Sequence, residues 1–169
     1  QALRPRQSIA EKVSSVPYDV VSTEEARSLG QNNPLSVLHV IRPEIDFSAV
    51  TDPYSDVIYA RAVQNFKRLQ EEGNFVRESE PSFYLYEQQK DQHRQQGLVG
   101  VCHVQDYESG MIKRHEKTRF EKERDRTRLT SELNANLGPV FLTYRDDLTL
   151  DLILKQAVTK SHRIFNFKT

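Results

Sequence analysis

The stretch PYSDVIYARAVQNFKRLQEEG, residues 53–73, is the clearest indication of the fold, because its apolar side chains recur at helical spacing. Three to four residues separate the members of one apolar row, which is the period of an amphipathic helix. The row consists of Ile58, Ala62, Phe66 and Leu69. We therefore predict a helix over about 53–72 that packs this face against a core.

Local end signals support this helix and one other, and an amphipathic pattern predicts a third. Asp52 followed by Pro53 predicts an N-cap and a first helical turn. Ser22 followed by Glu25 matches the S-x-x-E capping box, which predicts a short second helix. Helices are predicted over about 23–30, 53–72 and 148–160.

Alternating or β-rich runs predict strands between these helices, with a polar hairpin loop at QKDQHRQQ. Helices and strands mix without strict alternation. The predicted fold class is therefore α+β, with a mixed or largely antiparallel sheet and packed helices. We expect residues 1–169 to form a single domain, the N-terminal part of a longer protein. Strands are predicted near 35–41, 82–88, 96–107 and 140–145, and the strand at 96–107 is expected to be more buried than the one at 82–88.

Composition limits the classes of function. The 169 residues carry 24 basic and 24 acidic side chains, so a zero net charge argues against a general nucleic-acid coat. No stretch approaches the roughly 18 apolar residues of a membrane span. No secretory leader is visible, and Cys102 is the only cysteine. These features predict a cytoplasmic protein without a membrane partner, and nucleic acid is not expected as a partner. The oligomeric state is left open.

Charge is nevertheless concentrated in one segment, Lys113–Arg128, where eight of sixteen residues are Lys or Arg and four are acidic. Thr118 followed by Glu121 matches a second capping box and predicts that a helix starts at Thr118. The loop ahead of a helix N-terminus is a suitable anion site, because backbone N–H groups and the helix dipole face it. Cationic side chains surround this loop: Arg114, Lys117, Arg119 and Lys122.

Glu116 is the carboxylate within this cationic loop, where it stays ionised and is suited to accept a proton or bind magnesium. A simpler interpretation remains open, because acidic residues interleave with basic ones as on any solvated helix. Standard sites are absent: there is no P-loop, dinucleotide fingerprint, zincin helix, cysteine-rich zinc site or G-x-S-x-G elbow.

Longer motifs resemble a known family. ALRP, VPYDVVSTEEAR, NPLSVLHVIRPEID, QGLVGVCHVQDYESGMIKRHEKTR and GPVFLTY resemble domain-of-unknown-function family ten-fifteen, in its order, from residue 2 to about 160. More distantly, the sequence of a proline-containing strand, a sheet and a charged box opening a helix resembles the ParB/sulfiredoxin-like nucleotide-binding fold. That superfamily includes CTP-hydrolysing partition proteins, sulfiredoxins and free-serine kinases.

The distant resemblance implies a nucleotide-binding phosphotransferase or nucleotide hydrolase with a small hydroxyl-bearing acceptor. A non-catalytic nucleotide-gated switch and a structural interaction domain are the alternatives. By this resemblance, Glu116 is the general base or a magnesium ligand, and Asp19 is a second ligand or orients the acceptor. The implied phosphate-binding residues are Arg114, His115, Lys117, Thr118 and Arg119, with Tyr18, Arg4 and His93 as further pocket candidates. The sequence departs from partition proteins in having fewer consecutive arginines, and it lacks the sulfiredoxin Gly-Cys-His-Arg arrangement.

Overall fold

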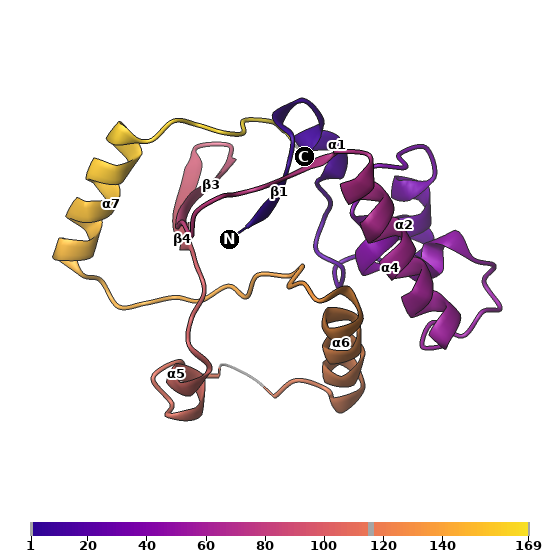
Figure 1. Ribbon diagram of the computed structural model, residues 1–169. Coiled ribbons are helices and arrows are strands. Elements are labelled where there is room, and N and C mark those ends of the chain that lie inside the picture. Colours follow the sequence, from indigo (N-terminus) through magenta and orange to yellow (C-terminus); the bar gives the residue numbers. More distant parts are fainter. Residues whose placement is uncertain (1, 115–116, 169) are drawn as a thin grey trace. The chain divides into compact units, whose positions relative to one another are not determined.

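The computed structural model describes residues 2–114 and 117–168 (Figure 1). Helices and two separate two-stranded antiparallel sheets confirm the predicted α+β class. In chain order the elements are β1 (Leu3–Pro5), the 3-10 helix η1 (Gln7–Ile9), α1 (Ala10–Val13), α2 (Thr23–Gly30), α3 (Leu38–Ile41), the 3-10 helix η2 (Pro43–Asp46), α4 (Asp56–Glu71), β2 (Phe75–Arg77), β3 (Tyr84–Lys90), β4 (His93–Val99), α5 (Val104–Glu108), α6 (Phe120–Leu133) and α7 (Leu148–Lys160).

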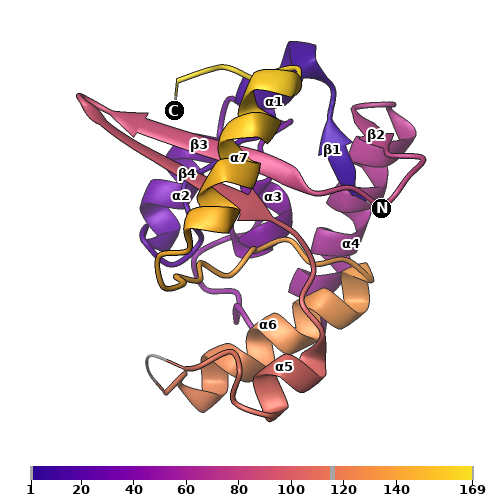
Figure 2. The ribbon, with the colours of Figure 1, turned by 90° about the vertical axis from the view of Figure 1, so that its left-hand side faces the viewer.

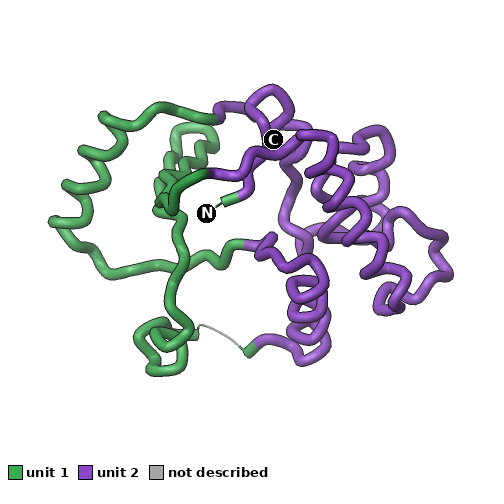
Figure 3. Tube along the Cα trace, viewed as in Figure 1, with its two compact units in different colours: residues 1–2, 79–117, 139–164 green, residues 3–78, 118–138, 165–169 purple. Residues whose placement is uncertain are grey.

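The chain divides into two compact units (Figure 3). Unit 1 comprises residues 1–2, 79–117 and 139–164, and unit 2 comprises residues 3–78, 118–138 and 165–169. The β1–β2 sheet lies in unit 2, whereas the β3–β4 hairpin lies in unit 1. A single domain over residues 1–169 stays a prediction.

Helix α4 supplies the core of unit 2, and its predicted apolar face is confirmed. Each member of the row, Ile58, Ala62, Phe66 and Leu69, is buried, and Leu69 is fully buried. Burying each large side chain of this kind stabilises the fold by about 1.5–3 kcal/mol. Helix α6 covers this core with Leu129 and Leu133.

The start of α4 differs from the prediction. The helix begins at Asp56 after Ser55, not at Pro53. Asp52 instead accepts a hydrogen bond from the Tyr54 N–H, at 3.0 Å, and forms a local turn ahead of the helix. Asp commonly folds back on the backbone two residues later, and here this competes with capping.

Helix α2 and its capping box are confirmed. Ser22 Oγ accepts from the Glu25 N–H (3.2 Å), and the Ser22 N–H donates to Glu25 Oε2 (2.7 Å). The hydrogen bond from the Ser22 backbone lowers the pKa of Glu25. Behind α2 lies a second apolar cluster, formed by Ala26, Leu38, Ile41 and Ile45.

The strand predicted at 35–41 is wrong, because this segment forms the short helix α3. Its apolar run is contacted by α2, α4 and η2, and no strand of the described chain pairs with it. Ser36 Oγ accepts from the Leu38 N–H at 3.2 Å and helps to start the turn. A short buried apolar run has no periodicity that separates a strand from a helix.

In unit 1 the hairpin is confirmed, but its second strand is not where it was predicted. The turn is only Asp91–Gln92, with Asp91 at a φ of 54° that suits a tight hairpin. Most of the polar stretch predicted as a loop is strand, so His93 begins β4 (Figure 2). The buried strand predicted at 96–107 is wrong, because β4 is exposed along its length and α5 follows it.

The remainder of unit 1 contains one confirmed helix. Helix α7 starts after Asp147, whose Oδ1 accepts from the N–H groups of Thr149 (2.8 Å) and Leu150 (3.0 Å). The strand predicted at 140–145 is wrong, since these residues have no regular structure. Apolar residues there, such as Phe141, stay largely exposed and lack a strand to pair with.

No described residue of unit 1 is fully buried. Large apolar side chains such as Val101, Phe83 and Leu148 are 97%, 72% and 81% exposed. An isolated hairpin is marginally stable in water, so unit 1 contributes little to a cooperative core. Among the described residues, no helix is both long and apolar enough to cross a membrane.

Candidate functional site

Tyr18 and Asp19 form a turn that is held by Arg42. Pro17 O accepts from the Val20 N–H at 3.3 Å, which closes the turn. Arg42 Nη1 donates to the carbonyls of Tyr18 (2.5 Å) and Val21 (3.0 Å). One guanidinium therefore satisfies two loop carbonyls, and Asp19 sits between them with an exposed side chain.

Arg42 is itself fixed from two further directions. Its Nη2 donates to Thr23 Oγ1 (2.8 Å) and its Nε donates to Glu44 Oε1 (2.6 Å). These partners belong to α2 and η2, so the turn is tied to two packed elements of unit 2. A loop that is already held by several hydrogen bonds loses little further conformational freedom when it binds a ligand.

The Tyr18 ring is covered by Arg126 of α6, with the guanidinium carbon 4.4 Å from the ring centroid. Arg126 Nη1 donates to Ile41 O (3.0 Å), and its Nε and Nη2 donate to Asp125 Oδ2 (2.9 and 2.6 Å). A cation over an aromatic ring is favourable by roughly 0.5–2 kcal/mol. The charged helix and the Tyr18–Asp19 turn are therefore in direct contact within unit 2.

Asp125 is the buried charge of α6. The hydroxyl of Tyr59 donates to Asp125 Oδ1 at 2.8 Å. Burial together with this carboxylate raises the pKa of Tyr59 to about 12. Arg128 covers the other side of the Tyr59 ring at 4.0 Å and pairs with Asp56 at 2.6 Å. Helix α6 from Asp125 onward is therefore part of the scaffold.

The start of α6 differs from the predicted capping box. The N-cap is Arg119, without any side-chain cap, and the first turn comprises Phe120, Glu121 and Lys122. Because the helix starts two residues later than predicted, Glu121 occupies the second helical position and cannot complete a box with Thr118. The Glu123 N–H makes the first helical bond, to Arg119 O at 3.0 Å. The N–H groups of the first turn are consequently left for solvent or a ligand.

The residues just ahead of α6 are exposed cations. Arg114 lies over the Tyr107 ring at 4.5 Å, and Lys117 and Arg119 are exposed. None of these three makes an ion pair with a residue in the described ranges 2–114 and 117–168. His115 and Glu116, the predicted phosphate ligand and base, lie outside the described residues.

The predicted site residues fall into both units. Asp19, Tyr18, Arg4, Thr118 and Arg119 belong to unit 2. Within it, Tyr18 is joined to α6 through Arg126, and Arg4 lines an open pocket of about 510 Å³ with Arg6, Gln7, Ser8 and Val76. Unit 1 carries the others, Arg114, Lys117 and His93.

Comparison with known proteins addresses the family. The whole of residues 1–169 matches the family described as "Protein of unknown function (DUF1015)". The chain belongs to the DUF1015 family. No curated protein and no solved structure matches it. The family predicted from the PYDV and RHEKT boxes is thus confirmed, whereas the likeness to the ParB/sulfiredoxin-like fold stays a prediction.

The DUF1015 chain also holds a polar cluster that sequence reasoning missed. His39, predicted to lie in a strand, is in α3 and contacts acceptors with both ring nitrogens: Nδ1 is 2.6 Å from Asp46 Oδ1, and Nε2 is 3.1 Å from Gly30 O. The Asn65 amide donates to His39 O and Asp46 Oδ2, both at 2.8 Å. A doubly protonated ring satisfies both acceptors, so these two contacts favour the charged form of His39. No linear motif joins these residues, which come from α3, η2 and α4.

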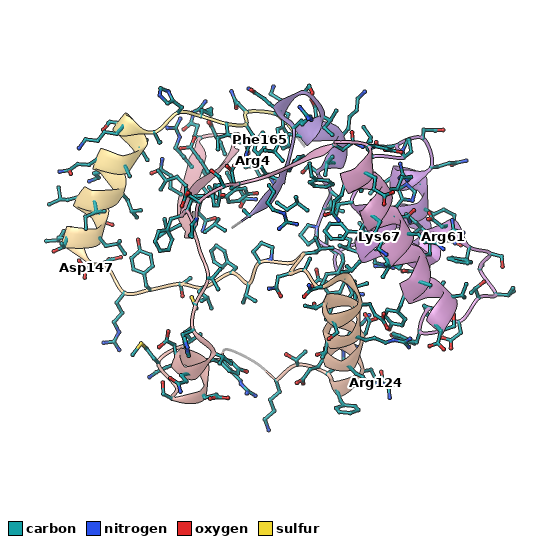
Figure 4. The ribbon with its side chains drawn as sticks, viewed as in Figure 1. Arg4, Arg61, Lys67, Arg124, Asp147 and Phe165 are labelled. Atoms are coloured by element: carbon teal, nitrogen blue, oxygen red, sulfur yellow. The ribbon has the colours of Figure 1, made fainter. Side chains whose placement is uncertain are left out.

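In this cluster the pKa of His39 is raised and the pKa of Asp46 is lowered. The hydrogen bond to Asp46 raises the pKa of His39 above its usual value, against the opposing effect of burial. Burial alone would raise the pKa of Asp46, but hydrogen bonds from His39 and Asn65 outweigh it and lower that pKa. Arg61 of α4 (Figure 4) adds a weaker attraction at 3.9 Å. This cluster is a structural ion pair between three elements.

The predicted magnesium site concerns Asp19 and Glu116. In the described part of the chain, no group of three or more His, Cys, Asp or Glu side chains is arranged to hold a metal ion. Carboxylate oxygens are ligands that Mg²⁺ prefers, and Mg²⁺ commonly binds through one or two carboxylates together with substrate phosphates. The two predicted ligands are of the right chemical type, and their pairing stays a prediction.

Proposed function

We propose that this DUF1015 chain binds a nucleotide and takes part in transfer or hydrolysis of its terminal phosphoryl group. The observation that carries the proposal is the start of α6. This helix of 14 residues begins without a side-chain cap and follows a run of exposed cations. Unsatisfied N–H groups and the positive end of the helix dipole favour phosphate there.

The cationic residues lie at different positions along the chain. Arg119 and Lys122 flank the first turn of α6, and Arg114 and Lys117 precede it along the chain. Phosphoryl transfer depends mainly on positioning and on neutralising the charge of the phosphate oxygens. The acidic Glu121 in the same turn opposes phosphate binding, so within this unit binding depends on Arg119 and Lys122.

Asp19 supports the catalytic half of the proposal. Its side chain is exposed and makes no ion pair with a residue of the described chain, although its backbone loop is held by Arg42 and Tyr18 is covered by Arg126. A carboxylate kept available on a fixed loop is suited to orient an acceptor hydroxyl. In the proposed step the acceptor oxygen forms the new P–O bond, the bond to the leaving oxygen breaks, and a carboxylate receives the hydroxyl proton.

Glu116 and Asp19 are the proposed carboxylates for that proton and for magnesium. Bound magnesium would neutralise phosphate charge and hold the phosphate oxygens in one geometry. A small molecule with a hydroxyl group, or water, is the proposed acceptor.

The first test is thermal unfolding with ATP, ADP or CTP, each with and without magnesium. A ligand at one hundred times its Kd stabilises the folded state by about 2.7 kcal/mol, which corresponds to roughly 5–10 °C for a chain of this size. Lys122→Gln should reduce the shift. The matched control is Lys67→Gln, because Lys67 is an exposed cation on α4 of the same unit (Figure 4).

Turnover is then measured with the nucleotide that binds, across a panel of small hydroxyl compounds. Asp19→Asn and Glu116→Gln should lower product formation by about a hundred-fold or more, as expected for loss of a proton acceptor. Glu80→Gln, a change at an exposed carboxylate, should leave it unchanged. Binding without any product would assign a nucleotide-gated switch instead. No shift with any nucleotide would refute the proposal and leave a structural interaction domain.

A further inference from the structure

A separate cationic pocket lies on the β1–β2 ribbon of unit 2 and shares no residue with the start of α6. Antiparallel pairing places Arg4 opposite Val76, and Leu3 opposite Arg77. Because side chains alternate along a strand, Arg4 and Val76 point to one face of the ribbon. Arg6, two residues after Arg4, shares that face, and its N–H continues the ladder to Asn74 O at 2.9 Å.

Each of the two guanidinium groups on this face is held through its Nε atom. Arg4 Nε pairs with Glu78, and Arg6 Nε donates to the carbonyl of Gly73. The two terminal nitrogens of each arginine make no hydrogen bond to a residue of the described chain. An arginine held by Nε offers a planar pair of donors already oriented for an oxyanion, which reduces the entropy lost on binding.

The open pocket of about 510 Å³ lies beside these groups. Arg4 and Arg6 line it together with Gln7 and Ser8 of η1, and Val76 supplies an apolar wall. No carboxylate lines it, and Glu78 offsets only one of the two arginine charges. The pocket thus combines a net positive charge with guanidinium, amide and hydroxyl donors. Arg4 stands on β1, as Figure 4 shows.

We infer that this pocket binds a phosphate group, either inorganic phosphate or the terminal phosphate of a small phosphate monoester. A tetrahedral dianion has enough acceptor oxygens for two guanidinium groups, the Ser8 hydroxyl and the Gln7 amide at once. A carboxylate has only two oxygens and would leave part of this donor set unused. The site is independent of the proposed function at α6.

The experiment is an NMR titration of the full ¹⁵N-labelled chain with sodium phosphate, at constant pH and ionic strength. Phosphate should shift the Nε–H signals of Arg4 and Arg6 and the amide signals of Gln7 and Ser8. Sodium acetate at the same ionic strength should shift them much less. Parallel titrations with glycerol 3-phosphate and ADP distinguish free phosphate from a phosphate ester as the preferred ligand.

Variants establish that the pocket is responsible. Arg6→Gln should weaken phosphate binding by about ten-fold or more, since it removes a charge-assisted hydrogen-bonding group. Ser8→Ala should weaken it less, and it tests the pocket without changing charge or the ribbon. The matched control is Arg77→Gln, which removes the same charge from the opposite face of the ribbon.

The outcomes separate this site from the one proposed at α6. Shifts at Gln7 and Ser8 that are lost in Arg6→Gln and kept in Arg77→Gln support the inference. Equal weakening by both arginine variants would show general charge attraction and overturn it. It also fails if neither phosphate nor either phosphate ester shifts any of the four signals at millimolar concentration, even where ADP shifts the amides of 120–122. In that last case the proposed function at α6 would stand by itself.

Discussion

Replacing Asp46 by Asn should destabilise the fold in a way that depends on pH. The substitution keeps the shape of the side chain but removes the negative charge that His39 faces at 2.6 Å. The side chains of His39 and Asp46 are only 16% and 14% exposed, so solvent screens the pair weakly. A charge-assisted hydrogen bond contributes about 1.5–3 kcal/mol, and the Asn65 amide loses a charged acceptor as well. We therefore expect a loss of about 2–3 kcal/mol in the free energy of unfolding near pH 6.

The sign of the pH dependence follows from the two pKa shifts. The pKa of His39 is raised above 6.5, so its contribution is complete below that pH and is lost as pH rises through the folded-state value. The pKa of Asp46 is lowered below 3.8, so its contribution is present above that pH and is lost as pH falls through the folded-state value. The difference between wild type and Asp46→Asn should be largest between about pH 4 and 6.5.

Urea unfolding measured from pH 5 to pH 9 checks this expectation. Glu71→Gln, which removes an exposed carboxylate from α4, is the matched control and should change the free energy of unfolding by less than about 0.5 kcal/mol. NMR titration of His39 should give a midpoint above the ordinary histidine value of 6.5. A loss below about 0.5 kcal/mol at pH 6, or a loss that does not change up to pH 9, would refute the assignment of His39 as a charged partner.

Three further predictions concern the scaffold. Leu69→Ala, at a fully buried position, should lower the free energy of unfolding by about 2–5 kcal/mol in chemical denaturation. Val57→Ala, on the exposed side of α4, should lower it by less than about 1 kcal/mol. Similar losses for the two variants would contradict the assigned core. Ser22→Ala should cost about 1 kcal/mol through loss of the α2 cap, and an unchanged unfolding midpoint would argue against the capping box in solution. In hydrogen exchange, amides of β3 and β4 should exchange at least about a hundred-fold faster than the central amides of α4, because no described side chain of unit 1 is buried. Equal protection would mean that unit 1 is covered in solution.

Some of the candidate site is readable from sequence. The Tyr18–Asp19 turn follows from Pro17 and from the local preference of Asp for turns, and the structure confirms it. Its attachment to α6 is not readable, because Arg126 is one of eight basic residues in a segment where nothing local distinguishes it from its neighbours. Only folding places it over the Tyr18 ring.

The sequence by itself determined the elements whose signals are local and repeated. The apolar face of α4 spans three turns, and the α2 capping box joins side chain and backbone within one turn. Both signals are therefore local and do not depend on how the rest of the chain folds. Tertiary structure decided α3, whose apolar run suits a strand or a helix equally until α2 and α4 bury it. It also decided the surroundings of His39. Its two ring contacts are with Asp46 and Gly30 on other elements, and a protonation state depends on the groups that folding brings within hydrogen-bonding distance.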